Sequence, residues 1–146
     1  MHAITDLPTL GEGTVDTLCL DNCFGINVNG LNTIPNLSLT KCYESTNIAT
    51  LGYGKVATLI LKELPNITDD TLDDLKTIPD LTFDWCFKLT NINKLGEGNV
   101  ERLHLSRLPN ITDVEALKNI PILIFKSCKN LTNTAVSKLG DGIVDT

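Results

Sequence analysis

The sequence predicts an α/β solenoid of repeated units, with one parallel sheet of about six short strands on the concave side and short helices on the convex side. We expect it to form a single domain over residues 1–146. Three observations predict it. A Leu-Gly-x-Gly string begins at Leu10, Leu51, Leu95 and Leu139, in steps of 41, 44 and 44 residues. A second, related unit lies within each long period and is marked by Ile-Pro at Ile34, Ile78 and Ile120. Both kinds of unit align on one template of about 22 residues, a length typical of stacked repeats.

The strand half of the template is a short apolar triplet with period-2 alternation, usually Leu-x-Leu. The triplets occupy residues 18–20, 37–39, 59–61, 81–83, 103–105 and 123–125. Period 2 is the spacing of a half-buried strand, so each triplet predicts one strand with two side chains in the core and one facing outward.

The helical half follows Ile-Thr-Asp at residues 67–69 and 111–113, where Thr or Asp can cap a helix. Leu72, Leu75 and Ile78 then recur three residues apart. The acidic run within residues 69–74 lies near a helix start, where the helix dipole favours negative charge. One strand and one short helix cannot bury their apolar faces alone, so we expect the units to stack around a shared core.

The paired glycines at 11/13, 52/54, 96/98 and 140/142 end the helical half and lead into a strand. A phosphate-binding glycine loop has the reverse order, because it follows a strand and opens a helix. We therefore expect cap and turn glycines with positive φ, and no nucleotide site.

Composition and charge exclude several classes of partner. The formal net charge is −6 and the pI is about 4.7, which argues against nucleic acid and anionic membranes. No apolar run approaches the roughly 20 residues that span a bilayer. Residues 1–6 lack the basic and apolar regions of a signal peptide. We expect a cytoplasmic or otherwise intracellular protein, secreted only if it is part of a longer chain with a signal sequence.

The template Leu-x-x-Leu-x-Leu-x-x-Cys-x-x-[Ile/Leu]-Thr-[Asp/Asn] resembles the cysteine-containing class of leucine-rich repeats, related to the ribonuclease-inhibitor type. The resemblance covers nearly the whole chain, and residues 123–133 are one of its clearer copies. The family's repeats are usually longer, and every second unit here carries Leu64 or Leu108 in place of the cysteine. The resemblance implies a right-handed leucine-rich repeat solenoid that recognises a protein partner. The family often follows an F-box in ubiquitin-ligase adaptors, but no segment here resembles an F-box.

Cys23, Cys42, Cys86 and Cys128 share one template position, just after a strand. We expect small buried groups whose thiols satisfy backbone atoms at the turn. Units that carry Cys42, Cys86 and Cys128 alternate, so these cysteines lie roughly 10 Å apart, beyond the ~7 Å limit for a disulfide. Cys23 and Cys42 are on adjacent units, but their side chains should run parallel into the core. No Cys-x-x-Cys pair offers the usual zinc spacing.

Groups that could carry catalysis are sparse. Of the two histidines, His104 is the middle residue of a strand triplet, and we expect it to be solvated on the concave face. Asn-x-Ser/Thr sequons begin at Asn36, Asn66, Asn110 and Asn130, and several arise from the turn consensus Pro-Asn-Ile-Thr, where Asn serves the turn. The sequence predicts no enzyme, no cofactor and no metal site.

Strand alternation selects the side chains that face a partner. The outward positions on the concave sheet are Cys19, Asp21, Ser38, Thr40, Ile60, Lys62, Thr82, Asp84, His104, Ser106, Ile124 and Lys126. The residues one step further on, Glu63, Trp85, Arg107 and Ser127, should lie along one rim of the same sheet.

Trp85 is the only tryptophan, and every other unit has a polar residue at its position. With its expected neighbours Glu63 and Arg107 it is our first candidate for a contact patch, because Trp and Arg dominate binding hot spots. Ile60 and Ile124 are expected to be exposed on the same face, which favours binding. Alternatively, Trp85 folds down over the turn and stacks with Arg107 without any partner.

Function and context stay open at this point. Residues 13–17 match residues 142–146, and neither end of the sequence has the polar cap that a stack of repeats needs. The chain could therefore belong to a longer repeat chain or associate end to end. The leading hypothesis is a protein–protein interaction module that binds through the concave sheet. The alternatives are a structural subunit of a larger assembly, or a substrate-recognition fragment of a ubiquitin-ligase adaptor if an F-box precedes it in a longer protein.

Overall fold

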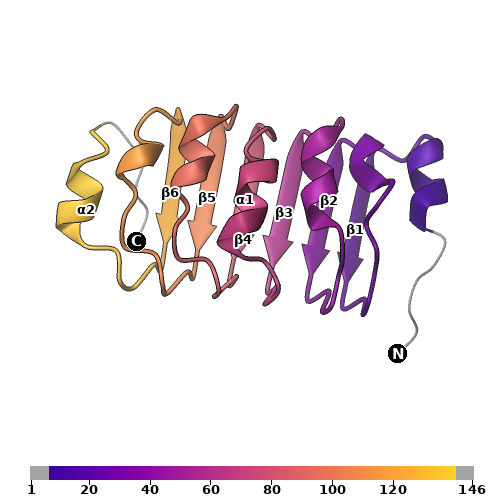
Figure 1. The fold of residues 1–146 in the computed structure, drawn as a ribbon, viewed down its shortest axis with the longest axis horizontal. Helices are drawn as coiled ribbons and strands as arrows, with labels where there is room; N and C mark the ends of the chain where they lie inside the picture. The colour runs from indigo at the N-terminus through magenta and orange to yellow at the C-terminus, as the bar shows by residue number, and fades with distance from the viewer. Residues whose placement is uncertain (1–6, 141–146) are drawn as a thin grey trace.

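The computed structural model describes residues 7–140 and contains one parallel six-stranded sheet whose strands follow chain order (Figure 1). The strands are β1 Thr17–Asp21, β2 Asn36–Thr40, β3 Thr58–Lys62, β4 Asp80–Asp84, β5 Arg102–Ser106 and β6 Ile122–Lys126. Each predicted triplet is the centre of one strand. Every strand pairs with the next one along the chain, so the predicted parallel sheet is confirmed.

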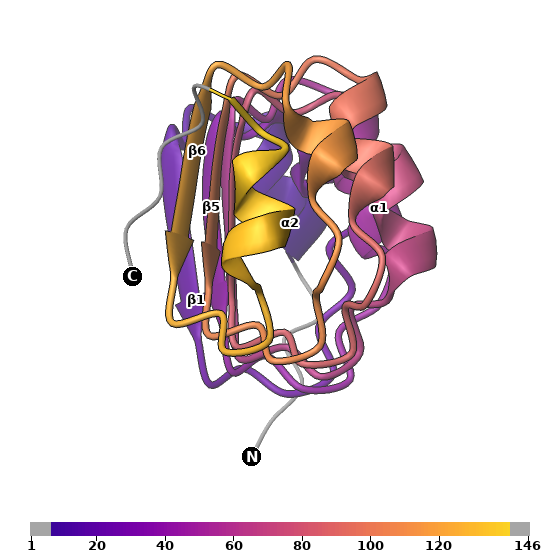
Figure 2. The ribbon, with the colours of Figure 1, turned by 90° about the vertical axis from the view of Figure 1, so that its left-hand side faces the viewer.

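Short helices cover one face of this sheet, and the other face is open (Figure 2). Two are α-helical, α1 Asp69–Leu75 and α2 Asn133–Ser137. The others are 3₁₀ turns: η1 Leu7–Glu12, η2 Leu31–Thr33, η3 Ile48–Tyr53, η4 Asn93–Glu97 and η5 Glu115–Leu117. A unit of about 22 residues leaves room for one or two turns of helix, and i→i+3 bonds suit such short pieces.

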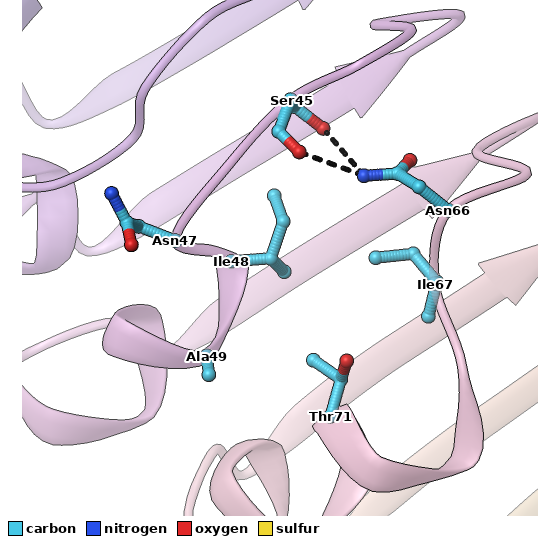
Figure 3. Close-up of a pocket in the computed structure, with 7 residues that line it drawn as sticks. All are labelled: Ser45, Asn47, Ile48, Ala49, Asn66, Ile67 and Thr71. Atoms are coloured by element: carbon cyan, nitrogen blue, oxygen red, sulfur yellow. Dashed lines mark hydrogen bonds between the residues drawn. The ribbon is translucent and has the colours of Figure 1, made fainter.

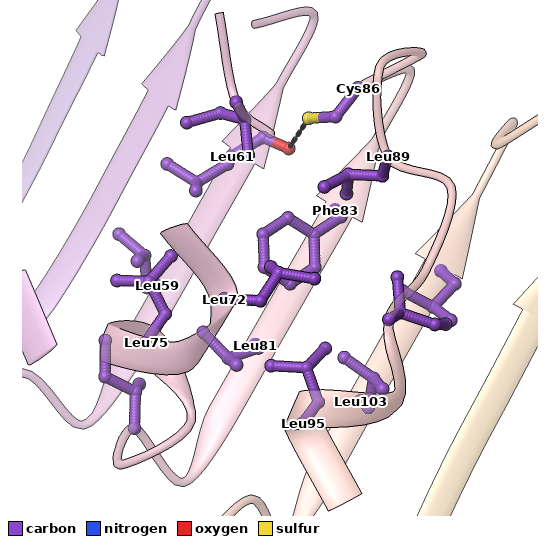
Figure 4. Packing of buried hydrophobic residues seen from close by; sticks show 14 of the residues in the cluster. Leu59, Leu61, Leu72, Leu75, Leu81, Phe83, Cys86, Leu89, Leu95 and Leu103 are labelled. Atoms are coloured by element: carbon purple, nitrogen blue, oxygen red, sulfur yellow. Dashed lines mark hydrogen bonds between the residues drawn. The ribbon is translucent and has the colours of Figure 1, made fainter. Parts of the chain in front are cut away.

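In-register pairing places equivalent apolar residues side by side in the core. Leu59, Leu81 and Leu103 are partners on β3, β4 and β5, and all three are fully buried. Leu72 and Leu75 of α1 pack against them from the helical layer (Figure 4). The sheet therefore holds each outward-facing residue beside its equivalents in neighbouring units.

The residue after each strand adopts a left-handed backbone conformation. Asn22, Lys41, Glu63, Trp85, Arg107 and Ser127 have φ between 51° and 58°. The Trp85 N–H donates to Ser106 O at 3.0 Å, which extends the β4–β5 ladder by one residue before the chain turns back. Positive φ is uncommon for residues other than glycine, so this regular row defines the turn edge of the sheet.

The cysteines after the strands bond to the backbone, as the sequence predicts. Only Cys42 and Cys86 are buried as expected, whereas Cys23 and Cys128, in the first and last of these units, are half-buried. The Cys86 thiol donates to Leu61 O at 3.5 Å on the preceding strand and to Asp84 O at 3.7 Å on its own strand. Burial raises the pKa of Cys86 to about 11, so the thiol stays protonated and can donate. All five cysteines are free.

The paired glycines do not have the role that we predicted for most of them. Only Gly140 of these pairs has a positive φ, 68°, within the described residues. A Cβ on Gly52 would lie 1.9 Å from Asp74 O, and one on Gly96 would lie 2.0 Å from Ala116 O. These glycines are required because the backbones of adjacent units approach closely there.

Three of the sequon asparagines form a ladder between units. The Asn66 amide donates to Ser45 O at 2.7 Å, Asn110 to Phe87 O at 2.6 Å, and Asn130 to Pro109 O at 2.5 Å. Each bond ties a turn to the turn before it, which agrees with the predicted role of Asn in the turn.

Candidate functional site

Trp85 lies at the turn edge of the open sheet face, directly after β4. Its side chain is 43% exposed, although tryptophan is usually well covered in a folded chain. Arg107 occupies the equivalent position after β5, and its guanidinium carbon lies 5.7 Å from the centre of the Trp85 ring. This distance allows a cation–π contact, so the structure brings together two of the predicted site residues.

Asp84 fixes the Arg107 side chain in this position. Arg107 Nε donates to Asp84 Oδ1 at 2.7 Å, and Nη2 donates to Oδ2 at 2.9 Å. The Asp84 side chain is 14% exposed, and the paired hydrogen bonds raise the pKa of Arg107. A bidentate pair holds the guanidinium plane in one orientation. Trp85, Arg107 and Asp84 together are called the Trp85 cluster below.

Glu63 lies in the same turn row on the preceding unit but is directed to another residue. Its carboxylate forms an ion pair with Lys41, with Nζ 3.8 Å from Oε2. Both groups are partly solvated, so the pair contributes little to stability. Glu63 therefore extends the rim without joining the Trp85 cluster.

A hollow of about 330 Å³ lies beside the Trp85 cluster, on the side toward the C-terminal unit. Trp85 and Pro109 provide apolar walls, and Arg107, Ser127 and Lys129 complete the lining. Our sequence prediction missed Pro109 and Lys129. The signal was present, because each follows a turn-row residue of its own unit by two positions.

A second hollow of about 360 Å³ lies on the open face over β3 to β6. It is lined by Ile60, Lys62, Thr82, Asp84, Arg102, His104, Ser106 and Lys126. The hollow thus contains three of the predicted site residues, Ile60, Asp84 and His104.

His104 is less solvated than we predicted. It is half-buried, and its Nε2 atom is buried without a hydrogen-bond partner in the part of the chain that the structure describes. Thr82, its partner in register on β4, is only 8% exposed. Burial lowers the pKa of His104, and the nearby charges of Arg102 and Lys126 lower it further. The imidazole is therefore neutral at pH 7.

Ile60 and Ile124 lie in the same row as His104, as expected, but both are half-buried. Side chains of neighbouring strands cover part of each isoleucine, because the strands are only about 4.8 Å apart. Ile122, at the start of β6, is more exposed, at 40%. So are the aromatic residues that follow three of the cysteines at the turn: Phe24 39%, Tyr43 40% and Phe87 40%. The sequence prediction did not single out this aromatic row.

Other parts of the described chain offer less chemistry. The hollow between Asn47 and Thr71 contains no charged group, and its Asn66 amide is bonded to Ser45 (Figure 3). Among residues 7–140, no cluster of His, Cys, Asp or Glu could hold a metal ion. No helix in this range is long and apolar enough to cross a membrane.

Neither known protein-family models nor curated protein sequences match this chain.

Proposed function

We propose that this chain is a right-handed leucine-rich repeat solenoid that acts as a protein–protein interaction module, binding through the open sheet face and its turn edge. The observation that supports it most is the Trp85 cluster: an exposed tryptophan under an arginine that a bidentate carboxylate already holds. Preorganised side chains lose little conformational entropy on binding. Tryptophan and arginine beside a hollow with apolar walls are the residues that dominate hot spots.

The position of the cluster also favours binding. The hollow at Pro109 lies on one side of it and the hollow at His104 on the open face beside it. The two hollows share the Asp84–Arg107 pair, since Asp84 lines one and Arg107 lines the other. A partner could therefore fill both hollows and cover the exposed part of Trp85 at once.

Variants of the cluster test the proposal. A tagged chain would be used to capture its partner, the partner identified by mass spectrometry and produced pure, and the dissociation constant measured. Trp85→Ala should weaken binding about 30-fold or more, the effect of losing a hot spot worth about 2 kcal/mol. Arg107→Glu should weaken it as strongly, because it removes the guanidinium that lies over Trp85 and lines the hollow.

The matched control is Tyr53→Ala. Tyr53 is 68% exposed and belongs to η3, on the helix-covered face, so this variant should bind like the wild type. The unfolding temperatures of Trp85→Ala and Tyr53→Ala should stay near that of the wild type. Arg107→Glu should unfold at a somewhat lower temperature, because it leaves the largely buried Asp84 beside a like charge. Unchanged affinity in both Trp85→Ala and Arg107→Glu would rule out this part of the surface.

A different observation favours a second function, a structural subunit that associates end to end. From residue 7 to residue 40 the chain has no Lys or Arg, whereas Glu12, Asp16 and Asp21 are acidic. From residue 116 to residue 140 it has no Asp or Glu and carries Lys118, Lys126, Lys129 and Lys138. The two ends of the described sheet, at β1 and β6, thus have opposite charge.

Sedimentation velocity tests this second function. Head-to-tail contacts between unlike ends form open series of oligomers and not a closed dimer. The mean mass should rise with concentration at low salt and fall at about 0.5 M salt, where screening shortens the range of the attraction. A monomer at every concentration and salt would exclude end-to-end association.

A further inference from the structure

The open face differs in charge from the rest of the molecule. Asp84 is paired with Arg107, and Asp80 is paired with Arg102, whose Nη1 lies 3.2 Å from Asp80 Oδ1. By contrast, Lys62 and Lys126 form no ion pair among the described residues, and both line the hollow that contains His104. The helix-covered side carries the acidic excess, including Asp69, Asp70, Asp73, Asp74, Asp113 and Glu115. The hollow is therefore a cationic region on an acidic chain with a formal charge of −6.

Several donors lie beside His104 in this hollow. Arg102, His104 and Ser106 are successive outward residues of β5, and Lys126 is the register partner of Ser106 on β6. Adjacent strands are about 4.8 Å apart, so the Lys126 ammonium and the Ser106 hydroxyl can reach a group placed over His104. Neither Ser106 nor Lys126 makes a side-chain hydrogen bond in residues 7–140.

The buried Nε2 of His104 lacks a partner, and such an atom ordinarily costs free energy unless something bonds to it. Protein atoms cover Nε2, so a group bound in the hollow would lie against the rest of the imidazole ring. A carboxylate of the chain itself would compete with a bound anion for the cations of the hollow. Asp84, which lines the hollow, is already bonded to Arg107, and the neighbouring Asp80 is bonded to Arg102. The unpaired charges that remain are those of Lys62 and Lys126.

We propose that this hollow binds an anionic group of the partner, a carboxylate or a phosphoryl group, through Ser106 and Lys126, beside the His104 ring. The inference rests on the proposed function, since it defines the chemistry of the partner: an acidic segment. Arg107 lies three residues beyond His104 along the strand direction, roughly 10 Å away. An extended segment with an acidic side chain and an apolar side chain two or three residues apart reaches both the His104 hollow and the Trp85 cluster.

An anion in this position changes the titration of His104. The imidazole is faced by Arg102, Lys126 and Lys62, which oppose its protonation, and by Asp84, which favours it. A bound anion adds a negative charge beside the ring and raises the pKa of His104. By linkage, affinity for the acidic segment increases as the pH falls toward that pKa.

In the first experiment, simple anions are titrated into the whole chain and the His104 ring signals are followed by NMR. Only two histidines are present, so the ring signals of His104 are resolved easily and assigned with His104→Gln. Titration with acetate, inorganic phosphate and a short poly-glutamate peptide should shift the His104 signals and raise its pKa. A response to acetate and poly-glutamate assigns a carboxylate ligand, whereas a response to phosphate alone assigns a phosphoryl group.

Two variants with equal changes of charge separate local binding from overall electrostatics. Lys126→Gln should reduce the affinity for the responding anion about fivefold or more, while Lys94→Gln, on η4, should leave it unchanged. His104→Gln keeps a donor but cannot titrate, so affinity should lose its increase between pH 7.5 and pH 5.5. The absence of a His104 response to all three probes, or equal effects of Lys126→Gln and Lys94→Gln, would overturn the inference.

The outcome also distinguishes this inference from the proposed function. Trp85→Ala should leave the His104 response to the small anions intact, because they do not reach the tryptophan. If Trp85→Ala weakens the partner while His104 responds to no anion, the interaction surface stands and the anion site is wrong. If His104 responds but Trp85→Ala and Arg107→Glu have no effect on the partner, the anion site stands without the interaction surface proposed around the Trp85 cluster.

Discussion

Replacing Gly52 with alanine tests how closely the units approach one another. The new Cβ would lie 1.9 Å from Asp74 O and 2.7 Å from the Asp74 carbonyl carbon, whereas real Cβ contacts are essentially never shorter than 3.0 Å. The two backbones must therefore separate by roughly 1 Å at this point. Asp74 belongs to α1, which is held by the buried Leu72 and Leu75, so the helix cannot move without disturbing the core.

The expected loss of stability follows from this overlap. Overpacking that forces a backbone shift costs about 1–3 kcal/mol. The cost here should lie at the upper end, because the new Cβ is attached to one backbone and meets another, and neither can rotate away as a side chain could. We expect Gly52→Ala to lower the free energy of unfolding by about 3 kcal/mol. For a chain of this size, each kcal/mol changes the unfolding temperature by about 2–4 °C, so the expected decrease is about 10 °C.

Gly13→Ala is the matched control. A Cβ on Gly13 would meet only Leu10 O, at 3.8 Å, and neither Gly13 nor Gly52 has a positive φ. Alanine there restricts the unfolded chain without a clash, so stability should stay equal or rise by up to about 1 kcal/mol. Thermal and urea unfolding followed by circular dichroism would compare the two. Equal unfolding temperatures for Gly52→Ala and Gly13→Ala would refute the close-approach explanation of the paired glycines.

Three further predictions concern titration, thiol reactivity and the turn. Because the pKa of His104 is lowered in the folded chain, the unfolded chain takes up this proton first as the pH falls, and stability should decrease below about pH 6.5. In urea-unfolding curves, His104→Gln should reduce that decrease. An identical pH dependence in the variant would contradict this prediction. In the native chain a thiol reagent should modify the exposed Cys19 first and Cys86 only on unfolding, because burial raises the pKa of Cys86 to about 11. Mass spectrometry would map the labelled cysteines, and rapid labelling of Cys86 in the native chain would refute its structural role. Asn66→Ala removes the donor to Ser45 O and should lower the free energy of unfolding by about 1 kcal/mol, whereas an unchanged urea midpoint would show that this bond contributes nothing.

The architecture was predictable because it depends on periodicity. The triplets at 59–61 and 81–83 repeat with the spacing of strands, and the structure pairs Leu59 with Leu81 and Leu61 with Phe83 in register. The same alternation placed His104 on the open face and Trp85 on the rim. Which side chains share a face of a strand follows from backbone geometry alone, so the sequence is enough to predict it.

The contacts at the site were harder to predict. The sequence placed Glu63 and Arg107 on either side of Trp85, but the structure pairs Glu63 with Lys41 and Arg107 with Asp84. A long charged side chain can reach several units, and its choice depends on the turn geometry. The row of positive φ values after the strands was also missed, because residues such as Trp85 rarely adopt that conformation.

The sequence by itself determined the repeat, the parallel order of the strands and the division into inward and outward residues, since each follows from short-range patterns along the chain. Only the tertiary structure decided which backbone atoms approach the paired glycines and which residues surround His104. Gly52 meets a carbonyl from residue 74, and the His104 ring lies between side chains of β4 and β6. Such contacts depend on distances between units, which are set when the whole stack packs and which no local pattern encodes.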